Sequence, residues 1–128
     1  MFEIGTVRTA PGVRKSGRLV VGHYPDGPVE APIVVVHGRG DGPVLWLQAC
    51  VHGGETGGTA GALRFINTLD PVTLRGIVIG VLAANPTASR RRARVSEVDG
   101  GNLNRLFPGQ AAGLHSMQTA DALRTPPE

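Results

Sequence analysis

The sequence predicts an α/β fold with a mixed, partly parallel sheet and flanking helices. Two apolar runs, 44–51 and 77–83, have the composition of strands that are buried on both faces. Between them, residues 59–69 change to a helical period. The apolar positions that share one helical face are Ala62, Leu63, Ile66 and Leu69. Because a strand, a helix and a strand in this order form a βαβ unit, the two strands are expected to be parallel.

The segments before this unit are assigned from local residue types. Residues 33–37 are mostly β-branched, which predicts a strand, and 19–22 is a shorter strand candidate. Turns are expected at 23–31, where Pro-Asp-Gly is the strongest signal, and at 38–43. Residues 1–16 show no periodicity, so no element is predicted there.

The segments after the unit are mostly polar. A long loop follows Asn85-Pro86 and extends to about Asn102, and loops of this length are commonly functional or disordered. A short helix is predicted over 116–123, and the end at 125–128 is expected to fray.

Composition indicates one folded domain. The chain has 128 residues, 41% of them apolar, which is enough to build a core. Glycine and proline are abundant but lie between apolar runs, which favours a loop-rich fold over disorder. We therefore expect a single domain over 1–128.

The sequence predicts a cytoplasmic protein. A single cysteine, Cys50, excludes an internal disulfide and suits a reducing compartment. The first residues lack the layout of a signal peptide. No apolar run approaches the roughly 18 residues that span a bilayer, so no membrane association is expected.

The basic residues raise the alternative of a nucleic-acid-binding module. The net charge is +3, and Arg90, Arg91, Arg92 and Arg94 lie together. However, no aromatic residue is interleaved with this run to form a stacking platform for bases. Nucleic acid is therefore the less favoured partner.

His52 and Glu55 are candidate metal ligands. Both lie where a predicted strand ends and a helix begins, and ligands bind at this end of strands in open α/β sheets. An imidazole and a carboxylate suit zinc, and the glycines between them allow the loop to aim both at one point. The alternative is a solvated histidine and a glutamate at the helix start, since H-x-x-E is a common spacing.

A second group of polar residues lies in the long loop. Arg94 is followed by Asp99-Gly100-Gly101-Asn102-Leu103-Asn104-Arg105. Guanidinium groups bind carboxylates in a bidentate fork, and a cation aimed at a carbonyl oxygen stabilises a developing oxyanion. These residues could therefore bind an anionic substrate, or they could form a polar surface loop.

Taken in order, these segments resemble the succinylglutamate desuccinylase/aspartoacylase family, whose members are relatives of the zinc carboxypeptidases. The resemblance covers roughly residues 17–110 and is most specific over Asp99–Gly109. The matching segments are Gly42-Pro43-Val44-Leu45-Trp46-Leu47, His52-Gly53-Gly54-Glu55, Leu74-Arg75-Gly76, Asn85-Pro86 and Asp99-Gly100-Gly101-Asn102-Leu103-Asn104-Arg105-Leu106-Phe107-Pro108-Gly109. The resemblance implies a carboxypeptidase-like fold and hydrolysis of the amide bond of an N-acyl amino acid. It also implies that 1–128 is the N-terminal portion of a single catalytic-type domain, in which 1–16 and 111–128 are poorly matched or flexible.

The resemblance also implies roles for the matching residues. His52 and Glu55 correspond to two ligands of a Zn²⁺ cofactor. Arg94 corresponds to the arginine that polarises the substrate carbonyl, although the neighbouring arginines leave this alignment ambiguous. Asn104 and Arg105 correspond to the pair that binds the carboxylate of a small-molecule substrate.

Two parts of the family pattern are absent. The family's third zinc ligand is a later histidine, and its general base is a later glutamate. Here the later histidine is His115, which we interpret as a surface residue, and Glu128 follows two prolines. The sequence therefore predicts an incomplete, C-terminally truncated member that binds zinc weakly, with a non-catalytic remnant of the fold as the alternative. Cys50 is interpreted as a small buried residue.

Overall fold

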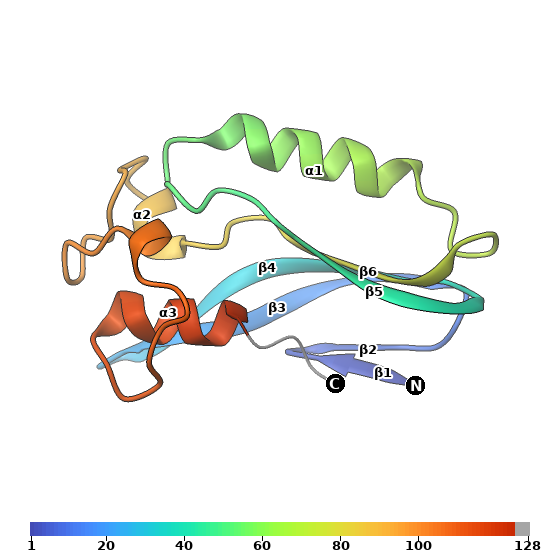
Figure 1. The fold of residues 1–128 in the computed structure, drawn as a ribbon, viewed down its shortest axis with the longest axis horizontal. Coiled ribbons are helices and arrows are strands. Elements are labelled where there is room, and N and C mark those ends of the chain that lie inside the picture. The colour runs from blue at the N-terminus through green and yellow to red at the C-terminus, as the bar shows by residue number, and fades with distance from the viewer. Residues whose placement is uncertain (125–128) are drawn as a thin grey trace.

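The fold is built on a four-stranded sheet, seen here in a computed structural model that describes residues 1–124 (Figure 1). The strand order is β3-β4-β6-β5, and a separate hairpin precedes it. The strands are β1 (Phe2–Ile4), β2 (Val7–Thr9), β3 (Val13–Tyr24), β4 (Gly27–His37), β5 (Gly40–Gln48) and β6 (Arg75–Val81). The helices are α1 (Thr56–Thr68), α2 (Pro86–Ser89), the 3₁₀ turn η1 (Leu103–Arg105) and α3 (His115–Arg124).

The sheet is mixed, as the sequence predicts. β4 pairs antiparallel with both β3 and β6, whereas β5 pairs parallel with β6. The chain passes from β5 to β6 through α1, which confirms the βαβ unit. Because the two strands are parallel, the loops that follow them leave the sheet at the same edge.

The sheet separates two apolar clusters. In Figure 1, α1 covers one face, while α3 and the β1–β2 hairpin lie on the other. On the α1 side the core includes Val36, Ile66 and Val78, and on the other side it includes Val35, Ile79 and Leu123. Alternate residues of β4 and β6 thus face opposite layers, as the two-residue period of a strand requires.

Helix α1 is anchored at both of its ends and along one face. The Thr59 hydroxyl donates to the Leu82 carbonyl at 2.6 Å, and the Arg14 guanidinium donates to the Ile66 carbonyl at 2.9 Å. Ile66 and Ala62 are buried against the sheet, but Leu63, expected on the same face, is 37% exposed. The buried stripe is therefore narrower than the sequence indicates.

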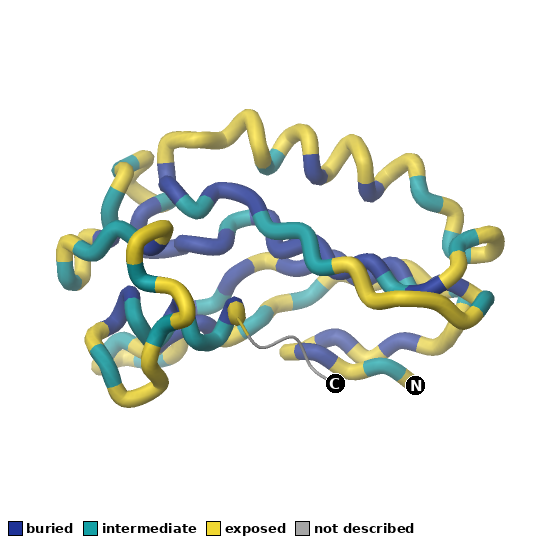
Figure 2. The backbone as a smooth tube through the Cα atoms, viewed as in Figure 1, coloured by how far each residue is buried: buried dark blue, intermediate teal, exposed yellow. Residues whose placement is uncertain are grey.

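The apolar run that ends β5 is not buried on both faces, so that expectation is wrong. Val44 is 47% exposed and Leu45 is 49% exposed, and Figure 2 shows the first part of β5 at the surface. The reason is the position of β5 at the edge of the sheet, where β6 is its one partner among the described strands. Apolar composition alone does not distinguish a central strand from an edge strand.

Several segments without a sequence signal are strands. Residues 1–16 form β1, β2 and the start of β3. The turn expected at 23–31 is shorter in the structure, because β3 extends to Tyr24 and β4 begins at Gly27. The expected turn at 38–43 shortens similarly, since β5 begins at Gly40. The expected fraying at 125–128 lies outside the described residues.

Helix α3 confirms the predicted short helix but not the expected exposure of its first residue. His115 is 8% exposed, and its ring stacks on the Tyr24 ring with centroids 6.0 Å apart. Gly22 permits this approach, because a Cβ added there would lie 2.7 Å from Cε1 of His115. Among the helices of the described part, none has the length and apolarity to cross a membrane.

Replacing Ile66 with alanine tests the packing of α1. Ile66 is 1% exposed, so Ile66→Ala should leave a cavity and lower the free energy of unfolding by about 2–5 kcal/mol. Leu63→Ala on the same helix is the matched control and should lower the free energy of unfolding by about 1 kcal/mol or less. Urea denaturation of the three proteins measures the difference, and equal losses would contradict the assignment of the buried face.

Candidate functional site

The candidate site lies at the carboxyl ends of β5 and β6. β5 ends at Gln48, and the chain turns through 49–55 before α1 begins at Thr56. β6 ends at Val81 and leads through Asn85 into α2. The Asn85 side-chain amide donates to the Val51 carbonyl at 3.1 Å. This hydrogen bond joins the loop after β6 to the loop after β5.

The turn after β5 has an unusual backbone and a close neighbour. Cys50 has a φ of 60°, in the left-handed region that non-glycine residues rarely adopt, and its buried thiol contacts the Ser89 hydroxyl at 3.4 Å. A Cβ at Gly53 would lie 2.3 Å from the Ala88 carbonyl carbon, so only glycine fits there. The Gly53 amide donates to the Ala93 carbonyl at 2.8 Å, which fixes the turn against the loop after α2.

The turn brings His52 and Glu55 together. Nδ1 of His52 lies 3.2 Å from Oε1 of Glu55. The imidazole is largely buried, with 11% of its side chain exposed, whereas 65% of the Glu55 side chain is exposed. The pair is therefore fixed on the histidine side and open to solvent on the carboxylate side.

Asn102 determines which nitrogen of His52 carries the proton. Its Oδ1 accepts from the backbone amide of Asn104 at 3.2 Å and lies 3.0 Å from Nε2 of His52. An oxygen that accepts there requires Nε2 to donate, so the neutral ring has its lone pair on Nδ1. That lone pair and the carboxylate oxygen of Glu55 then face each other as two acceptors, an arrangement that a cation between them would satisfy.

The fit of this pair to a metal ion is partial. A nitrogen lone pair and a carboxylate oxygen suit zinc, and a histidine ligand commonly donates its other N–H to an oxygen, as His52 does to Asn102. A catalytic zinc site needs three protein ligands. Within residues 1–124, no group of three or more histidine, cysteine, aspartate or glutamate side chains is close enough together to hold a metal.

The other predicted site residues lie in the loop after α2, and their neighbour Asn102 contacts His52. Asn104 and Arg105 lie on η1 and are exposed, and Asn102 caps that turn. The hydrogen bond from His52 to the Asn102 oxygen thus brings the η1 turn beside the candidate ligands. Arg94 is also exposed, and it directly follows Ala93, the residue bonded to Gly53.

Sequence reasoning assigned no role to Asn102. It lies in the segment that carries the resemblance, two residues before Asn104, where an asparagine oxygen accepts from a backbone amide and caps a turn. That local signal is readable from sequence. Its contact with His52 joins residues 50 positions apart, which only the fold shows.

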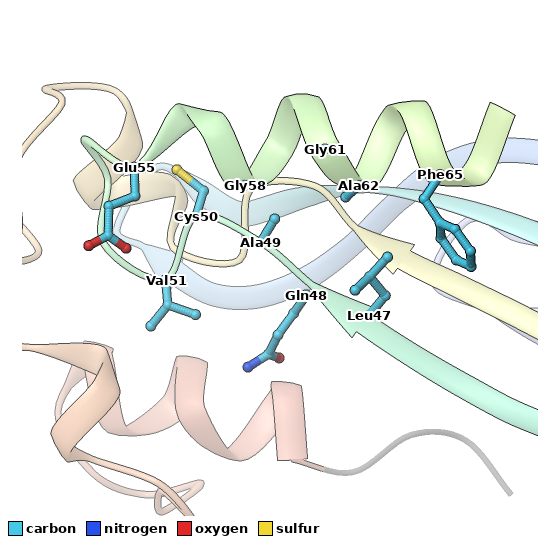
Figure 3. Close-up of a pocket in the computed structure, with 10 residues that line it drawn as sticks. All are labelled: Leu47, Gln48, Ala49, Cys50, Val51, Glu55, Gly58, Gly61, Ala62 and Phe65. Carbon is cyan, nitrogen blue, oxygen red and sulfur yellow. The ribbon is translucent and has the colours of Figure 1, made fainter. Parts of the chain in front are cut away.

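A pocket of about 540 Å³ adjoins the site (Figure 3). It lies between the free edge of β5 and α1, with Cys50, Val51 and Glu55 at one end and Phe65 toward the other. Most of its lining is apolar, and Glu55 is its one ionisable side chain apart from the Cys50 thiol. An extended, mostly apolar group would therefore fit beside Glu55.

Comparison with known proteins identifies the family. A family model described as the succinylglutamate desuccinylase/aspartoacylase catalytic domain matches residues 41–126. The chain belongs to this family. The resemblance seen in the sequence is thereby confirmed, and so is the mixed α/β fold, because solved structures of the family superpose on this chain.

Individual relatives agree with this assignment. The chain is 38% identical over 95 residues to N-alpha-acetyl-L-2,4-diaminobutyric acid deacetylase from Halomonas elongata. An aspartoacylase family protein from Mesorhizobium loti is 35% identical and superposes on 90% of the chain with a TM-score of 0.78. The product-bound ectoine utilization protein EutE (DoeB) from Ruegeria pomeroyi is 32% identical and superposes on 91% of the chain with a TM-score of 0.79.

The chain spans between 28% and 36% of the length of these relatives. It covers 36% of both solved structures and 28% of the deacetylase, while the deacetylase match covers 74% of the chain. The similarity therefore concerns the part of the family fold that contains His52, Glu55 and the η1 turn.

Asp99 holds the loop before η1, and its ionisation should affect stability. Burial by itself would raise the pKa of Asp99, but hydrogen bonds from the Ser116 amide and hydroxyl and from the Gly101 amide outweigh it and lower the pKa below 3.8. A lowered carboxyl pKa stabilises the fold above pH 3.8, and this stabilisation is lost as the pH falls further.

Asp99→Asn should therefore destabilise the protein at neutral pH. We expect a loss of about 1–3 kcal/mol, because the variant loses charge-assisted hydrogen bonds, and a weaker dependence of stability on pH below about 4. Thermal unfolding from neutral to acidic pH measures both effects. Asp41→Asn, at an exposed position of β5, is the control. Identical profiles for Asp99→Asn and the wild type would contradict the assignment.

Proposed function

We propose that this chain carries part of the active site of a zinc-dependent hydrolase that cleaves the amide bond of an N-acyl amino acid. His52 and Glu55 would hold the metal, Arg94 would polarise the substrate carbonyl, and Asn104 and Arg105 would bind the substrate carboxylate. The observation that carries the proposal is the His52–Glu55 pair, whose Nδ1 and Oε1 lie 3.2 Å apart.

Asn102 supports the metal assignment independently of the family. Because its Oδ1 accepts from Nε2 of His52, it directs the Nδ1 lone pair toward Glu55. Zinc bound there would lower the pKa of a water ligand and supply a hydroxide nucleophile at neutral pH. The protein's own contribution is to orient the ring and to place cationic and amide groups around the substrate.

The substrate class follows from the groups on η1 and from the relatives' names. Arg105 offers a guanidinium fork to a carboxylate, and Asn104 adds uncharged donors beside it. Both side chains are exposed and therefore accessible to a ligand. The names of the relatives describe removal of acetyl or succinyl groups from amino acids, which carry such a carboxylate.

Zinc binding tests the metal assignment. The described residues supply two protein ligands, so we expect zinc binding weaker than at a complete three-ligand site and little or no turnover of N-acetyl-2,4-diaminobutyrate. His52→Ala and Glu55→Gln should each abolish the binding, and Asn102→Leu should weaken it about 10–100-fold. Titration against a chromogenic chelator measures all three effects.

The control for these variants is His23→Ala, which removes an exposed histidine of β3. If the wild type binds zinc no better than His52→Ala, the metal assignment is wrong, and the alternative of a non-catalytic remnant of the fold is favoured. If turnover is substantial and is lost in His52→Ala, our expectation of an incomplete site is wrong, and the hydrolase assignment stands.

Ligand binding tests the role of Arg105 separately from the metal. Arg105→Met should weaken the binding of an N-acetyl amino acid about tenfold or more, because it removes a charge-assisted hydrogen bond. NMR titration measures the affinity. The matched ligand control is the same compound with its carboxylate converted to an amide, which should bind the wild type and Arg105→Met equally. A loss of affinity that is the same for both ligands would contradict a carboxylate contact.

A further inference from the structure

A buried hydrogen-bonded cluster lies behind the candidate site. It joins three elements: Thr87 of α2, Ser96 of the long loop, and His115 at the start of α3. The Thr87 and Ser96 hydroxyl oxygens are 2.6 Å apart, and Nε2 of His115 is 3.3 Å from the Thr87 oxygen. The three residues are 0%, 1% and 8% exposed, respectively. None of them takes part in the proposed chemistry.

The cluster is connected to the candidate ligands by two routes. Thr87 donates to Oδ1 of Asn85, whose amide donates to the carbonyl of Val51, the residue before His52. Ser96 starts a closed turn in which the Ser96 amide donates to the Gly101 carbonyl at 3.0 Å. The next residue, Asn102, contacts His52. The position of His52 therefore depends on this cluster from both sides.

The hydrogen bonds also determine the protonation of the His115 ring. A proton on Nδ1 would be a buried N–H without an acceptor among the described residues, so the neutral ring carries its proton on Nε2, which donates to the Thr87 oxygen. Nδ1 is then a bare lone pair. It is buried and has no hydrogen-bond partner among the described residues. A proton added at Nδ1 would create a buried N–H without an acceptor.

The surroundings of the ring oppose a positive charge. Burial lowers the pKa of His115, and the one opposing influence is Asp99, whose carboxylate favours the charged form. On the β3 side the ring lies against Gly22 and the Tyr24 ring. The charged groups around Tyr24 are Glu97, Arg90 and Asp26.

We propose that His115 is a positioning residue whose neutral ring holds the loop of residues 96–105 against His52, and whose protonation releases that loop. The importance of the loop for substrate binding rests on the proposed function. The link between protonation of His115 and opening of the loop does not depend on that function. The physical reason is that an imidazolium is more stable in an open state, where water can accept from Nδ1, than in the closed cluster.

Hydrogen exchange of the loop amides tests this proposal without any hydrolase assay. Below its ordinary pKa of 6.5, His115 binds a proton more readily in the open state, so opening should increase as the pH falls. Between about pH 7.5 and 5.5, the protection factors of the Ser96 and Gly101 amides should fall up to tenfold. Amides of β4, such as Val35, should keep their protection.

His115→Gln is the decisive variant, because glutamine can still donate to Thr87 but does not titrate. Its loop protection should be independent of pH over this range. His23→Gln, which removes an exposed titratable imidazole from β3, should behave as the wild type does. If the wild-type loop keeps its protection at low pH, or if His115→Gln loses it as the wild type does, the proposal is wrong.

A second measurement covers the case in which His115→Gln does not fold. The imidazole carbon resonances of the wild-type protein report the titration of each histidine. The midpoint for His115 should lie below its ordinary value of 6.5, and loop exchange should increase as the pH falls from 6.5 toward that midpoint. Loop opening that follows another histidine would overturn the proposal.

Discussion

The parallel pairing of β5 with β6 is the constraint on which the rest of the site depends. It aligns the carboxyl ends of the two strands, so that the turn carrying His52 and Glu55 meets the loop that carries Asn85. An antiparallel arrangement would place these loops at opposite edges of the sheet. The connection through α1 makes the parallel pairing possible, and the buried face of α1 holds that connection against the sheet.

Close backbone contacts then fix the two loops to each other. At Gly53 the backbone approaches Ala88 more closely than any side chain permits, and its amide is bonded to Ala93. The left-handed backbone of Cys50 turns the chain sharply enough to reach this contact. The candidate ligands are thus held by main-chain hydrogen bonds and by Asn102, which leaves few rotamers for the His52 ring.

The loop of residues 96–105 is ordered because several other elements supply partners for its hydrogen bonds. Asp99 accepts from Ser116 at the start of α3 and from Gly101 within the loop, and the cluster around His115 joins the loop to α2 and β3. A segment without an apolar period can be rigid when other elements supply its partners. The same dependence makes the loop responsive to any change in those partners.

Periodicity and ordered motifs are local properties of the chain, so the βαβ unit, the short C-terminal helix and the family could be predicted from the sequence, which also supplied the candidate site residues. The tertiary structure was needed to show that β5 is an edge strand among the described strands, that residues 1–16 form strands, and that His115 is buried. It also decided that Asn102 orients His52. These features depend on pairings between distant residues, such as Gly22 with His115, and a single sequence carries no local signal for them.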